Sequence, residues 1–119
     1  MMTIVFSILG LFVFLCLLFP VPASAAALPA LKVLSTPSCP ACAQMYRVVD
    51  EIDSQYSGKL TTEKVNLYEH RDIAQQYNVR YVPHLLFVDA SGSVVKEKVG
   101  YASLEEVLKT FQEAGIDVG

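Results

Sequence analysis

The chain has 119 residues and a formal net charge of −3, and 53% of its residues are hydrophobic. None of its nine Lys and Arg or twelve Asp and Glu residues occurs before Lys32. The charged part of the chain, roughly ninety residues, is long enough for one small domain with a single hydrophobic core. The charges are interspersed and mildly acidic, which argues against the basic surfaces that proteins use to bind nucleic acids or anionic membranes.

The N-terminal segment predicts export from the cytoplasm. Residues 4–19 are almost wholly apolar, but this run of about sixteen residues falls short of the ~20 that span a bilayer comfortably. The A-x-A pattern of small residues at 23–25 suits a signal-peptidase site, although no Lys or Arg precedes the apolar run. Residues 1–27 are therefore expected to be a signal peptide, with an uncleaved N-terminal membrane anchor as the alternative. Either one places the domain formed by residues 28–119 in the periplasm or outside the cell.

From residue 31 onward, the apolar pattern predicts a series of short strands and helices. Strands are expected at 31–35, 60–67, 85–88 and 93–99, and helices at 40–56, 70–77 and 103–114. A helix joins the first two strands, which should be parallel, whereas a turn at 89–92 should make the last two an antiparallel hairpin. An S-x-x-E capping box at 103–106 marks the start of the last helix. The expected fold class is α/β, with a four-stranded mixed sheet in the order β-α-β-α-β-β-α flanked by helices.

Two of the three cysteines, Cys39 and Cys42, form a C-x-x-C pair where the first strand gives way to the first helix. The free N–H groups and the dipole of a helix N-terminus favour a thiolate, which is the nucleophile of disulfide exchange. Cys39 is therefore the expected attacking cysteine, and Cys42, one turn deeper, the resolving one. The third, Cys16, lies in the apolar segment. By itself C-x-x-C is also half of many zinc sites, so a metal site is the alternative.

Together these motifs resemble the thioredoxin superfamily, in a compact extracytoplasmic form, over about residues 31–114. The C-P-A-C sequence at 39–42 is similar to the family's redox motif, and Val82-Pro83 is similar to the cis-proline that lies against the cysteines. Gly100 and Lys64 fall where the family has a glycine near the active-site groove and a lysine beneath the active site. The resemblance implies a thioredoxin-like fold and a redox-active disulfide, with no other cofactor.

Three positions depart from the family pattern. Ser38 precedes the first cysteine where thioredoxins usually have tryptophan. Val33 stands where they have a buried acid that helps to remove the proton of the second cysteine, so deprotonation of Cys42 would need water, Lys64 or another group. His84 follows the proline where threonine is common. An imidazolium at that position would stabilise the nearby thiolate, and the alternative is a solvated residue that shapes only substrate contact.

The expected site has two catalytic residues, Cys39 and Cys42, and no metal. The residues expected to tune the redox pair or to form the substrate groove are Pro40, Ala41, Val82, Pro83, His84 and Lys64. An extended peptide substrate should pair with the backbone of Val82 in the manner of an added strand.

The expected function is extracytoplasmic thiol–disulfide exchange. Disulfide reduction is preferred to oxidation because the domain is minimal and lacks the inserted helical region of dedicated oxidases. The expected partners are protein thiols and disulfides and a membrane thiol carrier as electron donor, with the protein acting as a monomer. Two alternatives remain, a non-catalytic thioredoxin-fold interaction module and a metal-binding protein that uses Cys39 and Cys42, with or without His84.

Overall fold

The computed structural model describes residues 27–118, and the expected signal peptide or anchor lies outside them except for its last residue. The elements in order are β1 (Ala30–Ser35), α2 (Pro40–Gln55), β2 (Thr61–Asn66), α3 (Arg71–Gln76), β3 (His84–Val88), β4 (Val94–Val99) and α4 (Leu104–Glu113). This is the order that the sequence predicts, and the ends that differ do so by a single residue. Between residues 27 and 118, no helix combines the length and the apolar character needed to cross a bilayer.

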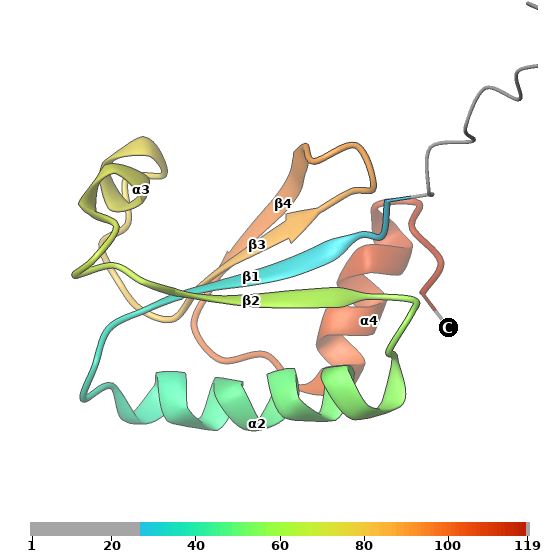
Figure 1. Cartoon of the computed structure of the whole chain (residues 1–119), viewed down its shortest axis with the longest axis horizontal. Coiled ribbons are helices and arrows are strands. Elements are labelled where there is room, and N and C mark those ends of the chain that lie inside the picture. The colour runs from blue at the N-terminus through green and yellow to red at the C-terminus, as the bar shows by residue number, and fades with distance from the viewer. Residues whose placement is uncertain (1–26, 119) are drawn as a thin grey trace, which may run out of the picture.

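The strands form one mixed sheet in the order β2-β1-β3-β4 (Figure 1). β1 and β2 are parallel and are connected through α2, whereas β3 runs antiparallel to both β1 and β4. The parallel β1–β2 pair and the antiparallel β3–β4 pair agree with the sequence prediction, because a helical crossover returns the chain in the same direction and a tight turn reverses it. The sequence makes no prediction for the β1–β3 pair. The expected fold class is confirmed.

The two faces of the sheet carry separate cores, and the alternation of side chains along each strand assigns every residue to one face. One face packs against α2 and α4, and the other lies toward α3 (Figure 1). The first core contains Leu31, Val33, Met45, Val48, Val49, Ile52, Leu60, Leu85, Phe87, Ala102, Val107, Phe111 and Val118. The second contains Leu34, Val65, Leu67, Leu86 and Val88. This division decides which polar side chains can reach the cysteine pair, which belongs to α2.

Helix α2 begins at the cysteine pair for local reasons. Cys39 is its N-cap, with an extended backbone, and Pro40 occupies the first helical position. Proline is tolerated there because an N–H at that position would have no acceptor within the helix. The N–H of Ala43 donates to the carbonyl oxygen of Cys39 at 3.1 Å, which closes the first helical turn. Because Met45 and Ile52 are fully buried against the sheet, this first turn is held at a defined place beside β1.

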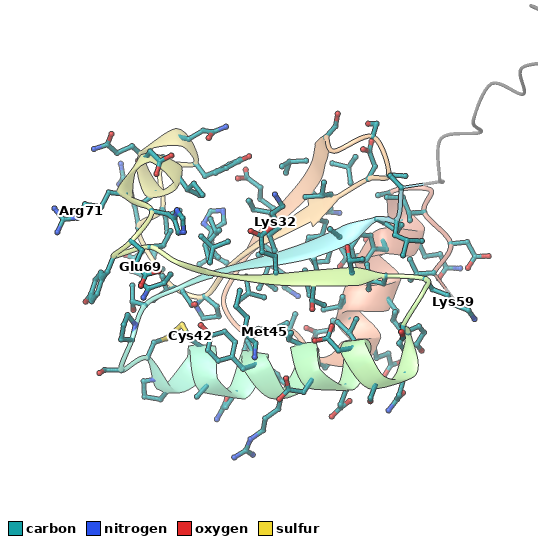
Figure 2. All side chains as sticks on the ribbon, viewed as in Figure 1. Lys32, Cys42, Met45, Lys59, Glu69 and Arg71 are labelled. Carbon is teal, nitrogen blue, oxygen red and sulfur yellow. A yellow bond between two sulfur atoms is a disulfide. The ribbon has the colours of Figure 1, made fainter. Side chains whose placement is uncertain are left out.

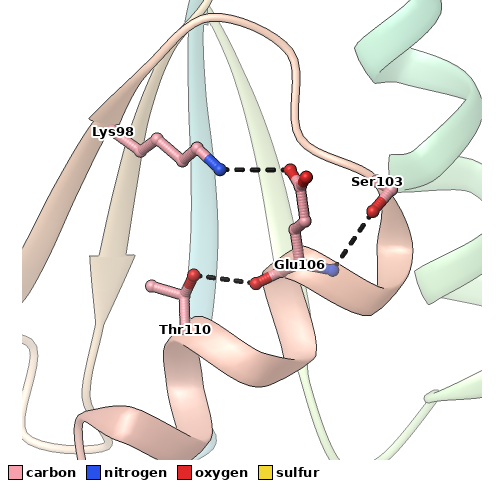
Figure 3. A network of polar contacts seen from close by, with 4 residues as sticks. All are labelled: Lys98, Ser103, Glu106 and Thr110. Atoms are coloured by element: carbon pink, nitrogen blue, oxygen red, sulfur yellow. Dashed lines mark hydrogen bonds and ion pairs between the residues drawn. The ribbon is translucent and has the colours of Figure 1, made fainter.

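Helix α4 is held by a cap and an ion pair at its N-terminus (Figure 3). The Oγ atom of Ser103 accepts a hydrogen bond from the N–H of Glu106 at 3.2 Å, as the capping box predicts. The carboxylate of Glu106 lies 3.1 Å from Nζ of Lys98 on β4, and that hydrogen bond and charge hold the pKa of Glu106 below its usual value. The side chain of Thr110 donates to the carbonyl of Glu106 at 2.7 Å. The contact between Lys98 and Glu106 ties α4 to the edge strand β4.

Candidate active site

Cys39 and Cys42 are joined by a disulfide, with Cα atoms 5.2 Å apart. Their exposure differs, since Cys39 is half-buried and Cys42 is only 1% exposed. Figure 2 shows Cys42 in the first turn of α2 and Met45 in the next, on the side of the helix that faces the sheet. Cys39 can therefore be reached by an incoming thiol or disulfide, whereas Cys42 is enclosed by the protein.

The helix terminus acts directly on the Cys39 sulfur. The N–H of Cys42 donates to Sγ of Cys39 at 3.1 Å, so the N-cap position is filled by sulfur where a Ser or Asp oxygen is more usual. In the reduced protein the same N–H and the helix dipole favour negative charge on that sulfur. Ser38, the residue before it, has a φ of 64°, in the left-handed region that turns the chain from the strand into the helix.

The loop before β3 approaches Cys39 from the other end of the sequence. The Val82–Pro83 peptide bond is cis, and the carbonyl oxygen of Val82 lies 4.0 Å from Sγ of Cys39. The N–H of Gly100 donates to the carbonyl of Pro83 at 2.8 Å, which ties this loop to the end of β4. Tyr81 is 72% exposed beside it. The backbone of Val82 is therefore placed where a substrate bound to Cys39 can meet it.

Lys64 lies on β2 and reaches the site through a tyrosine. Its Nζ atom is 4.7 Å from the centroid of the Tyr46 ring and 3.5 Å from Oδ1 of Asp50. Lys64 is opposite Val33 in the parallel ladder, so its side chain shares the α2 face of the sheet. The ammonium of Lys64 therefore lies on the α2 face of the sheet, against the ring of Tyr46.

Two hydroxyl side chains at the site were not among the expected residues. The Oγ atom of Ser35, which is 1% exposed, is hydrogen bonded to the hydroxyl of Tyr46 and lies 3.4 Å from the carbonyl oxygen of Val65. Sequence signals for both exist: Ser35 follows Leu31 and Val33 on the period-two face, and Tyr46 is four residues after Cys42. Neither signal is specific, because a strand often ends in serine and a helix stripe often contains tyrosine.

The Ser35–Tyr46 pair and the cysteines share one cavity. This open cavity has a volume of about 460 Å³. Its lining residues are Ser35, Thr36, Pro37, Ser38, Cys39, Pro40, Cys42, Ala43, Tyr46 and Asn66. Of the residues expected to surround the cysteines, only Pro40 belongs to this lining, while Val82 and Pro83 meet Cys39 through the loop contact described above.

The structure corrects the expectation for His84. His84 is the first residue of β3 and pairs with Leu34, so its side chain lies on the α3 face of the sheet, away from α2. It is 7% exposed, its Nε2 atom is 3.3 Å from Oε1 of Glu97, and its buried Nδ1 atom has no hydrogen-bond partner within residues 27–118. The imidazole is therefore directed toward β4 and does not face the Cys39 sulfur.

The position of His84 also bears on the metal-binding alternative. That alternative uses the two cysteine sulfurs, with or without the imidazole as a third ligand, and the imidazole is directed toward Glu97 on β4. Across residues 27–118, the structure gathers no group of three or more His, Cys, Asp or Glu side chains that could hold a metal ion.

Comparisons with known proteins agree with this geometry. A family model described as a thioredoxin-like domain matches residues 21–115. Thioredoxin 1 of Nostoc sp. is 34% identical over 85 residues, covering 71% of this chain and 78% of the relative. Thioredoxin of Synechocystis sp. is 41% identical over 86 residues, covering 72% and 79%, and thioredoxin of Pseudomonas aeruginosa is 39% identical over 79 residues, covering 66% and 70%.

Two solved structures share the fold at low sequence identity. One, described as a malarial protein, has a TM-score of 0.67 at 15% identity, covering 73% of this chain and 97% of its own. The other is a thioredoxin-2, described as a component of the malaria parasite protein secretion machinery, with a TM-score of 0.64 at 17% identity and coverages of 72% and 82%. At these identities the likeness concerns the arrangement of the chain alone.

Proposed function

We propose that this chain, which belongs to the thioredoxin-like family and is a thiol–disulfide oxidoreductase, works outside the cytoplasm as a protein disulfide reductase. The observation that carries the proposal is the asymmetry of the cysteine pair. The sulfur of Cys39 is accessible, accepts a helix N-terminal N–H and lies beside the Val82–Pro83 loop, whereas Cys42 is buried. The Cys39 sulfur can therefore attack a substrate, whereas the Cys42 sulfur can attack only the Cys39 sulfur.

The catalytic cycle follows from this asymmetry. The Cys39 thiolate attacks one sulfur of a substrate disulfide, forming a mixed disulfide and releasing the other substrate sulfur as a thiolate. Cys42 then loses its proton and attacks the Cys39 sulfur. The bond between Cys39 and the substrate breaks, and its electron pair leaves with the substrate sulfur. The substrate is reduced, and the enzyme is left with the Cys39–Cys42 disulfide that the structure contains.

Protein disulfides are the substrate class that thioredoxin-family enzymes act on, and the loop geometry supports the same choice here. An extended segment next to Cys39 can hydrogen bond with the backbone of Val82, because the sulfur and that carbonyl lie 4.0 Å apart. The redox-active disulfide is proposed to suffice without a further cofactor, and the enzyme to act as a monomer.

The reductase direction is supported by the short connection between β2 and β3. Among the described residues, this connection contains only the six-residue helix α3, whereas dedicated oxidases of the superfamily carry an inserted helical region there. After each turnover, the disulfide must be reduced again by an external dithiol. Outside the cytoplasm, the proposed donor is a thiol carrier in the membrane.

The reduction potential of the Cys39–Cys42 pair tests the direction. After equilibration with defined thiol buffers, a value near ~−270 mV is expected for a reductase, and a value near ~−120 mV would identify an oxidant and contradict the proposal. The location is tested separately by fusing residues 1–27 to alkaline phosphatase, which is active only after export. An active fusion is expected, and an inactive one would contradict the extracytoplasmic location.

A further inference from the structure

The resolving step has an unmet requirement in this protein. Cys42 must lose its thiol proton to attack, yet it is 1% exposed, and burial disfavours the charged form of a thiol. The cavity beside it is lined by Ser, Thr, Pro, Cys, Ala, Tyr and Asn, and none of these side chains is a carboxylate, an imidazole or an amine. Val33, on the same face of the sheet, is apolar and fully buried. The groups available to carry a proton are hydroxyls.

The Ser35–Tyr46 pair is the hydroxyl group best placed to do so. Tyr46 follows Cys42 by four residues and so lies on the same side of α2, and helical side chains lean toward the N-terminus, over the preceding turn. Ser35 ends β1 on the α2 face and is hydrogen bonded to the Tyr46 hydroxyl. Its Oγ atom donates to the carbonyl oxygen of Val65 at 3.4 Å. That separation is longer than an ordinary O–H···O hydrogen bond, and either hydroxyl of the pair can be the donor to the other. When Ser35 donates to Tyr46, the Ser35 oxygen keeps a lone pair for a further proton donor, and the Tyr46 hydrogen is free to bond to water in the cavity.

We propose that the Ser35–Tyr46 hydroxyl pair conducts the Cys42 proton to the water of the open cavity during the resolving step. As the proton leaves, the Cys42 sulfur bonds to the Cys39 sulfur, and the substrate sulfur departs with the electron pair of the broken bond. The proton passes to cavity water, and the departing thiolate takes up a proton from solvent. This inference rests on the oxidoreductase mechanism proposed above and names the groups that serve its second step.

Lys64 lies next to the tyrosine of the hydroxyl pair. Its ammonium lies over the Tyr46 ring at 4.7 Å, and it is held there by Asp50 at 3.5 Å. The charged or titratable groups that the structure records around the hydroxyl pair are thus Cys39, Cys42 and Asp50 of α2 and Lys64 of β2. Lys64 is a positioning residue, because it reaches the cysteines only through the tyrosine.

The two steps can be timed separately with 5,5′-dithiobis(2-nitrobenzoate), an aromatic disulfide that releases one coloured thiolate in each step. The full chain, carrying Cys16→Ser so that only the pair reacts, is reduced and mixed with the reagent. In Tyr46→Phe, the first release is expected to stay within about twofold of the parent rate and the second to slow about tenfold or more. The difference in second-step rate between Tyr46→Phe and the parent should decrease as pH rises, because hydroxide then removes the Cys42 proton without the hydroxyl pair.

Ser35→Ala is expected to behave like Tyr46→Phe, and the double variant no worse than the slower single one, because two groups acting as one unit are not additive. Tyr56→Phe, which removes a hydroxyl at the other end of α2, is the matched control and should leave both steps unchanged. Equal slowing of both steps, or a second-step deficit that does not depend on pH, would show a structural effect and overturn the relay, as would an unaffected second step. If the parent itself shows no two-step release, the oxidoreductase mechanism fails instead.

Discussion

The imidazole of His84 and the carboxylate of Glu97 meet on the face of the sheet opposite α2, with Nε2 3.3 Å from Oε1. His84 follows the cis-proline directly, yet its side chain is turned from the cysteines because neighbouring residues of a strand point to opposite faces. The active-site loop and this buried pair are therefore adjacent in sequence but separated by the sheet.

The first prediction follows from that separation. Replacing His84 with alanine should leave the reactivity of Cys39 unchanged, because the imidazole does not face the sulfur. The rate of Cys39 alkylation, followed against pH in parent and His84→Ala, should give midpoints that agree within about 0.3 pH unit. Glu97→Gln serves as the matched control for the contact between these two side chains. A midpoint displaced by about half a unit or more in His84→Ala alone would show that the imidazole acts on the thiolate.

The second prediction concerns the order of attack. Cys42→Ser, in a chain that also carries Cys16→Ser, should trap a covalent mixed disulfide between Cys39 and a protein substrate. Reduction of insulin should fall by about 100-fold or more, because the intermediate cannot be resolved. A species of higher mass on a non-reducing gel, lost on adding dithiothreitol, is the readout.

Cys39→Ser in the same background is the control for trapping. It should form no such species, since the remaining sulfur of Cys42 is 1% exposed. Trapping by Cys39→Ser and not by Cys42→Ser would reverse the assigned roles.

The third prediction concerns the cap of α4. Ser103→Ala removes the acceptor of the Glu106 N–H and should lower the free energy of unfolding by about 1 kcal/mol. Ser54→Ala is the matched control, because Ser54 is an exposed serine within α2, and its replacement should change stability by less than about 0.5 kcal/mol. Urea denaturation followed by circular dichroism measures both. Equal losses of stability in the two variants would show that the Ser103 cap does not stabilise α4.

The fourth prediction concerns acid stability at the β3–β4 turn. The Ser91 hydroxyl, and after it the N–H of Ser93, hold the pKa of Asp89 below its usual value. A carboxyl whose pKa is lower in the folded chain than in the unfolded chain stabilises the fold above the unfolded pKa of ~3.9, and the contribution is lost as pH falls through the folded value. Asp89→Asn should therefore be less stable than the parent at neutral pH.

The difference between Asp89→Asn and the parent should shrink as the pH falls below about 4. Ser91→Ala, which removes the largest cause of the lowered pKa, should reproduce part of the effect. Thermal unfolding at a series of pH values provides the measurement. A stability difference that stays constant from neutral to acid pH would mean that the carboxyl charge plays no part in the turn.

The seven elements of residues 27–118, and the directions of the β1–β2 and β3–β4 pairs, could be predicted from the sequence because local signals agree with one another at each of them. The apolar stripe of α2, the proline at its first position and the capping box at Ser103 each mark an element without reference to the rest of the chain. The cysteine pair could be predicted for the same reason, since its spacing and its place before a helix are both local.

The surroundings of the pair were harder to predict because they depend on which face of the sheet a side chain occupies. The sequence predicts that β3 begins at Leu85, which leaves His84 in a loop and the direction of its side chain undetermined. In the structure β3 begins at His84, so the alternation of the strand places the ring on the α3 face. The contact between Ser35 and Tyr46 joins the end of a strand to the second turn of a helix. Hydrophobic periodicity does not report contacts between polar side chains, and therefore the apolar pattern does not predict the contact between Ser35 and Tyr46.

The unequal cover of the two sheet faces has a consequence for how the molecule fluctuates. In the part of the chain that the structure describes, the α2 and α4 face has thirteen buried core residues, whereas the α3 face has five, and α3 itself buries none of its six residues. Short elements with few buried contacts open locally at little cost, while well-packed ones open only with the whole domain. Amide hydrogens of α3 should therefore exchange with solvent long before those in the middle of α2. The redox centre, anchored on the slow-exchanging side, keeps its geometry while the opposite side of the protein opens and closes.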